Sequence, residues 1–194
     1  MTLRDRLRAD TRPAHDRVDA AFSGLGVTER RGYRAFLAAH LVALSALRPA
    51  PGPGDAALAA EMADLRSRLR ADLQQLGANG SMPPLPGRRC LDPRALGYVL
   101  HGSRMGMAVL HRRWRAAGDA RLRRAGAFLS TPPAPARWGA ICAGLSRMSP
   151  DGPTADRVIA EAGTVFAIYE HSALSQARPL KGCPDAQRLA PAQH

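Results

Sequence analysis

Apolar residues recur every three or four positions along most of this chain, which is the spacing of one face of an α-helix. The first such stripe is followed by Gly24 and Gly26, and it consists of Leu3, Leu7, Thr11, Ala14, Val18 and Phe22. A second stripe extends from Tyr33 to Leu47, and Thr28 is the expected N-cap of its helix. The alternation that is typical of strands is nearly absent. The pattern therefore predicts an all-α protein.

Proline and glycine delimit the remaining helices. Residues 49–54 (Pro-Ala-Pro-Gly-Pro-Gly) interrupt the pattern, and Asp55 is expected to cap a third helix that ends near Leu76. Asp92-Pro93 is typical of an N-cap followed by proline at the first helical position, and it starts a helix that reaches about Ala117. Further helices are expected near 119–129, at 133–147, and from Pro153 to about Gln176.

The domain organisation follows from the same pattern. No internal repeat or long linker divides the chain, so residues 1–177 are predicted to form a single helical domain. Residues 178–194 lack periodicity, and we expect a flexible C-terminal tail there.

The formal net charge is +12, and Lys181 is the only lysine, so arginine accounts for almost all of the positive charge. This excess permits binding to nucleic acid or an anionic surface. The arginines are scattered along predicted helices without a basic tail, so a solvated basic surface is the simpler explanation. Three widely spaced cysteines argue against a disulfide framework or a zinc site. Without a signal-like segment or a long apolar run, we expect a soluble cytoplasmic protein with no membrane partner.

Two glycines, Gly102 and Gly106, lie four residues apart inside the predicted helix 93–117. Each costs about 1 kcal/mol of helix stability relative to alanine, so a close approach of another helix or of a ligand is the usual reason for such a pair. Helical spacing places the pair on one face with Val99, Ser103 and Leu110. Spacing alone favours a contact between helices over a ligand-binding wall.

His15 is the histidine with the most informative surroundings. It lies beside the apolar stripe of the first helix, so its imidazole can point inward, and Arg12 and Arg8 precede it by one and two turns. A neutral imidazole with neighbouring cations suits an iron porphyrin, because nitrogen binds the metal and guanidinium groups bind the propionates. The alternative is a helix whose arginines are merely solvated.

Two segments together resemble the haem oxygenase family, most closely its bacterial branch, which includes members associated with bacteriophytochromes. They are residues 11–19 (Thr-Arg-Pro-Ala-His-Asp-Arg-Val-Asp) and residues 98–106 (Tyr-Val-Leu-His-Gly-Ser-Arg-Met-Gly). The resemblance extends from about Leu3 to Ala177, and residues 33–40 and 162–166 look like the family's second and last helices. It implies a helical bundle that holds haem between the first helix and a glycine-containing distal helix.

The resemblance also implies roles for single residues. His15 matches the proximal ligand of the haem iron, and Gly102 and Gly106 match glycines whose backbone lies over the porphyrin. Ser103 stands where many relatives have an aspartate that organises distal water. The residues expected to contact the cofactor besides His15 are Arg8, Arg12, Tyr98, Val99, Met107 and Phe166.

The implied activity is cleavage of haem to biliverdin, CO and iron, with haem b as both cofactor and substrate. The reaction needs O₂ and electrons from a ferredoxin or flavin reductase, or from ascorbate in vitro. A bacteriophytochrome is a candidate acceptor of the biliverdin.

Two departures from the family pattern leave alternatives open. Met107 stands where many relatives have a small residue, and its thioether could narrow the distal pocket or reach the iron. His101 replaces a frequent acidic residue and is expected to face a neighbouring helix or solvent. The alternatives to an enzyme are a haem sensor, storage or delivery protein on the same fold and, from charge alone, a helical adaptor or nucleic-acid-associated protein.

Overall fold

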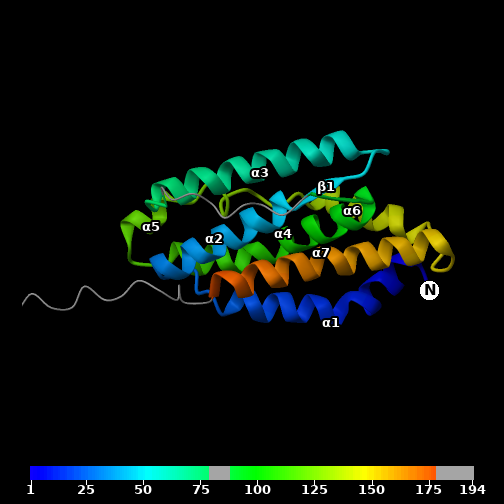
Figure 1. Cartoon of the computed structure of the whole chain (residues 1–194), viewed down its shortest axis with the longest axis horizontal. Coiled ribbons are helices and arrows are strands. Elements are labelled where there is room, and N and C mark those ends of the chain that lie inside the picture. The colour runs from blue at the N-terminus through cyan, green and yellow to red at the C-terminus, as the bar shows by residue number, and fades with distance from the viewer. Residues whose placement is uncertain (79–87, 178–194) are drawn as a thin grey trace, which may run out of the picture.

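The computed structural model describes residues 1–78 and 88–177, and these form an elongated bundle of helices (Figure 1). The helices within these ranges are α1 (Leu3–Ser23), α2 (Arg30–Ser45), α3 (Asp55–Gln75), α4 (Pro93–Arg115), α5 (Ala120–Arg124), α6 (Pro135–Ser146) and α7 (Pro153–Ala177). The expected helical fold is confirmed. No helix in the described part of the chain is long and apolar enough to cross a membrane. The expected tail at 178–194 lies outside the described residues.

Three helix boundaries differ from the expectation. Glu29 rather than Thr28 occupies the N-cap position of α2 and makes no side-chain cap hydrogen bond. The N-cap of α3 is Gly54, whose φ of 81° is the left-handed conformation that glycine adopts without strain. Asp55 is instead the first helical residue, and its carboxylate accepts hydrogen bonds from the backbone of Gly52 and Ala56. α5 ends at Arg124 rather than near residue 129, because the chain leaves the helical conformation at Ala125.

Two three-residue strands were not expected. β1 (Leu47–Pro49) pairs in parallel with β2 (Arg89–Leu91), with Leu47 opposite Arg89. A segment of three residues is too short to show alternation, so this pairing depends on the packing of the surrounding helices. It brings the chain that leaves α2 beside the chain that enters α4.

The last helix, α7, is central to the bundle and packs against α1, α2 and α4 (Figure 1). The predicted stripe of α1 faces inward, with Leu3, Leu7 and Thr11 buried. An aromatic cluster forms part of the core, and its members are Phe22, Tyr33, Phe36, His40, Phe128 and Tyr169.

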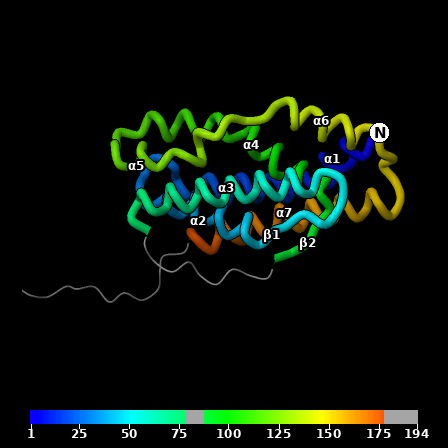
Figure 2. The backbone as a smooth tube through the Cα atoms, turned by 90° about the horizontal axis from the view of Figure 1, so that it is seen from above, coloured from blue at the N-terminus to red at the C-terminus, as the bar shows by residue number. Residues whose placement is uncertain are grey.

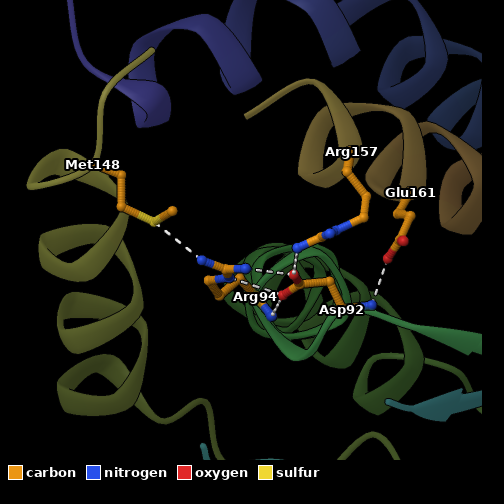
Figure 3. A network of polar contacts seen from close by, with 5 residues as sticks. All are labelled: Asp92, Arg94, Met148, Arg157 and Glu161. Carbon is orange, nitrogen blue, oxygen red and sulfur yellow. Dashed lines mark hydrogen bonds and ion pairs between the residues drawn. The ribbon is translucent and has the colours of Figure 1, made fainter. Parts of the chain in front are cut away.

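A polar network around Asp92 holds the start of α4 (Figure 3). As predicted, Asp92 is the N-cap: its Oδ1 accepts from the backbone N of Arg94 at 2.9 Å, and its Oδ2 accepts from Arg94 Nη2 at 2.6 Å. Burial opposes the charge on Asp92, but the hydrogen bonds from Arg94 outweigh burial and lower the pKa of this carboxyl. Glu161 of α7 accepts from the backbone N of Asp92, and Arg94 Nη1 reaches Met148 Sδ beyond α6. The network therefore ties α4 to α7 and to the end of α6.

Candidate functional site

His15 lies at the surface of α1 rather than inside the bundle, which differs from the inward orientation that the apolar stripe suggested. Its side chain is 49% exposed, and its Nδ1 is 3.3 Å from Asp19 Oδ2. On the other side, the ring meets Phe166 of α7 edge-on, with 5.7 Å between the ring centroids. A carboxylate at Nδ1 favours the tautomer that keeps the proton there and leaves Nε2 free to bind a metal.

His15 and Phe166 lie at the same height along the bundle. α1, α4 and α7 run in the same direction (Figures 1 and 2). α1 and α7 are in register, because the rings of His15 and Phe166 are in contact and Arg17 pairs with Glu170. The start of α4 is shifted along α7, since the backbone N of Asp92 donates to Glu161, so equal positions in α4 and α7 do not lie at one level.

The two glycines of α4 have different surroundings. A Cβ atom built on Gly102 would lie 3.4 Å from the indole ring of Trp138 on α6, so Gly102 packs against a helix. A Cβ atom on Gly106 would have no atom of a neighbouring element within 4 Å. The helix-contact explanation thus applies to Gly102, whereas Gly106 borders open space that a ligand can occupy.

The predicted face of α4 is divided between core and surface. Ser103 is exposed, and its Oγ donates to the carbonyl of Leu100 at 2.8 Å. Val99 and Met107 are instead buried, so neither belongs to the exposed face. In their place, Met105 and Val109 are 40% and 45% exposed beside Gly106. From Ser103 to Val109, the exposed part of α4 is consequently apolar apart from the serine hydroxyl, and exposed arginines follow toward the end of the helix (Arg112, Arg113 and Arg115).

Basic groups gather near the first turns of α1 and α4. Burial raises the pKa of the Tyr98 hydroxyl, while the charges of Arg4 and Arg8 act in the opposite direction. The roles of Arg8 and Tyr98 in haem binding stay predictions. Arg12 is exposed and pairs with Asp16 at 2.9 Å.

His101 faces a neighbouring helix, as expected. It is only 3% exposed, and its Nε2 lies 3.4 Å from Glu61 Oε2 on α3. Burial lowers the pKa of His101. This histidine therefore lies away from the exposed face of α4.

Two features of the site were missed in the sequence. Asp19 follows His15 by one helical turn, and this spacing could have identified it as the partner of the imidazole. Trp138 has no comparable signal, because it reaches Gly102 from a separate helix.

No family model matches this sequence, and the search of curated proteins found no relative.

Proposed function

We propose that the protein is a haem oxygenase that cleaves haem to biliverdin, CO and iron with O₂ and an external reductant. The observation that supports this most directly is the half-exposed imidazole of His15, which has a carboxylate at Nδ1 and the phenyl ring of Phe166 against it. These residues fit an iron porphyrin: a free imidazole nitrogen for the metal, the uncovered backbone at Gly106 with apolar side chains for the ring, and the guanidinium group of Arg8 for a propionate.

When bound, haem supplies the redox chemistry and the binding of O₂. On the proximal side, His15 would hold the iron through Nε2 while Asp19 accepts a hydrogen bond from Nδ1–H and fixes the orientation of the ring. Phe166 packs against one edge of the imidazole and restricts its rotation. An imidazole lacks the strong electron donation of a thiolate ligand, which suits oxidation of the ring itself.

On the other side, Gly106 would let the flat ring approach the backbone of α4, because it has no side chain and no neighbour fills the space. Met105 and Val109 supply apolar surface that excludes water. The Ser103 hydroxyl is the polar group on this exposed stretch, and it can hold a water molecule and pass a proton from it.

The proposal is tested by hemin turnover in the full chain, with Gly106→Leu compared to Ala108→Leu. Both positions are exposed on α4, so both variants should fold as the wild type does. With ascorbate or a reductase, wild type and Ala108→Leu should replace the Soret band by biliverdin absorption. Gly106→Leu should bind hemin about tenfold or more weakly, since its side chain would fill the ligand space. A persistent Soret band and no CO from the wild type would refute the enzymatic activity.

A haem-binding protein without turnover is the second candidate, since the same donor set would hold haem in either case. The feature that favoured it was Met107 as a sixth iron ligand. Met107 is buried in the core, where it supplies packing. Its substitution by alanine should therefore lower stability and leave the spin state of bound haem unchanged. A change from low spin to high spin would favour the second candidate.

A further inference from the structure

A cavity of about 360 Å³ lies between α3, α4 and α6, away from the surface assigned to haem. Its walls are mainly apolar and are formed by Ala57, Leu58, Gly97, Ile141, Leu145 and Met148. The volume falls in the usual range of small-molecule sites. None of the residues proposed to contact haem lines it.

One end of the cavity is polar. Arg137 Nη1 donates to Glu61 Oε2 at 2.5 Å, and Nε2 of the buried His101 lies 3.4 Å from the same oxygen. Among the described residues that line the cavity, Glu61 is the single carboxylate, and Arg137 already matches its charge. The remaining donors of Arg137 have no acceptor in the part of the chain that the structure describes.

Arg94 lines the cavity at another point. Its Nε and Nη2 donate to Asp92, but the acceptor of its Nη1 is the thioether of Met148, at 3.6 Å (Figure 3). Sulfur is a weak acceptor, so this N–H retains most of its capacity to bind an oxygen anion. The lining therefore contains two guanidinium groups with spare donors and a single, already paired carboxylate.

We propose that this cavity is a second binding site, for a small organic anion with an apolar body and one carboxylate or sulfonate group. The body would lie among Leu58, Ile141 and Leu145, and the anion would accept hydrogen bonds from the guanidinium groups. The site is independent of haem cleavage, so either proposal can fail without the other.

The test uses the full chain and calorimetric titration with 8-anilinonaphthalene-1-sulfonate. Gly144 lines the cavity, and a Cβ atom there would have no neighbour within 4 Å, so Gly144→Leu should fill the space without a clash. Gly139→Leu is the matched control, because Gly139 lies on the same helix, has equally open surroundings and does not line the cavity. Ala57→Leu fills the cavity from α3 and serves as a second variant.

Wild type and Gly139→Leu should bind one equivalent of the probe. Gly144→Leu and Ala57→Leu should bind it at least about tenfold more weakly while retaining the helical circular dichroism spectrum. N-phenyl-1-naphthylamine, which has the same apolar body without the sulfonate, should also bind the wild type about tenfold more weakly. Absence of saturable binding, or equal binding by the wild type and both filled variants, would overturn the site. Equal affinity for the two probes would overturn its preference for anions.

Discussion

The imidazole ring of His15 on α1 meets the phenyl ring of Phe166 on α7 at an interplanar angle of 67°. Phe166 is buried, whereas His15 is half-exposed, so the pair joins the core of the bundle to its surface. Because of this geometry, His15 can be substituted without loss of packing in the core. Iron ligation can therefore be tested separately from folding.

His15→Ala should abolish the iron–imidazole signature of hemin-loaded protein, because the proposed axial ligand is removed. The unfolding free energy should change by no more than about 1 kcal/mol, since the lost side chain is half-exposed. Absorption and electron paramagnetic resonance spectra measure the ligation, and urea titration measures stability. His171→Ala, at an exposed site on α7, is the matched control. Unchanged axial ligation in His15→Ala would show that another residue binds the iron.

Gly32→Ala should destabilise the protein by more than about 2 kcal/mol, because a buried clash forces the backbone to shift. A Cβ atom at Gly32 would overlap the carbonyl oxygens of Leu25 and Gly26, where the turn after α1 approaches the start of α2. Gly106→Ala should instead stabilise the apo protein by up to about 1 kcal/mol, because it improves helix propensity without a clash. Urea unfolding of the two variants tests this contrast. A stable Gly32→Ala variant would contradict the close approach.

His40 should make the protein sensitive to mild acid. Burial lowers its pKa to about 4, although its hydrogen bond with the carbonyl of Phe36 acts in the opposite direction. His40 takes up a proton near pH 6.5 in the unfolded chain but only near pH 4 in the folded chain. Its contribution to the free energy of unfolding is therefore present above pH 6.5 and is lost as the pH falls toward 4. The loss between pH 7 and pH 4.5 should be about 2 to 3 kcal/mol.

The measurement is urea unfolding at both pH values, with His40→Gln as the comparison. The variant removes the titrating group, so its stability should change less between pH 7 and pH 4.5. His111→Gln controls for a histidine outside the aromatic cluster. Equal pH dependence in His40→Gln and the wild type would assign the acid sensitivity to other groups.

Asp72→Ala should cost about 2 to 4 kcal/mol, because two backbone N–H groups would lose a charged acceptor. The buried Asp72 of α3 accepts from the backbone of Ala127 at 2.9 Å and of Phe128 at 2.8 Å. Asp64→Ala removes an exposed carboxylate from the same helix and should cost less than about 1 kcal/mol. Thermal and urea unfolding measure both. Similar losses in the two variants would mean that Asp72 does not secure the segment before α6.

The start of α4 shows which features local signals predict well. Asp92-Pro93 was identified as an N-cap and first helical residue because both preferences act within a few residues. The apolar stripe of α1 is predicted equally well, because the residues that share one face of a helix are set by their spacing in the sequence. By contrast, Thr28 has the right chemistry for an N-cap, but the chain turns into α2 only after Glu29.

Local patterns in the sequence were enough to predict the order of the helices, the apolar face of α1 and the candidate residues His15, Gly102 and Gly106. That Trp138 covers Gly102 and leaves Gly106 open follows only from the packing of α6 on α4. The burial of Met107 and the pairing of β1 with β2 likewise depend on contacts between distant elements. The physical reason is the range of the interactions: helical periodicity and capping act over a few residues, whereas each of these outcomes depends on side chains or backbone from an element distant in the chain.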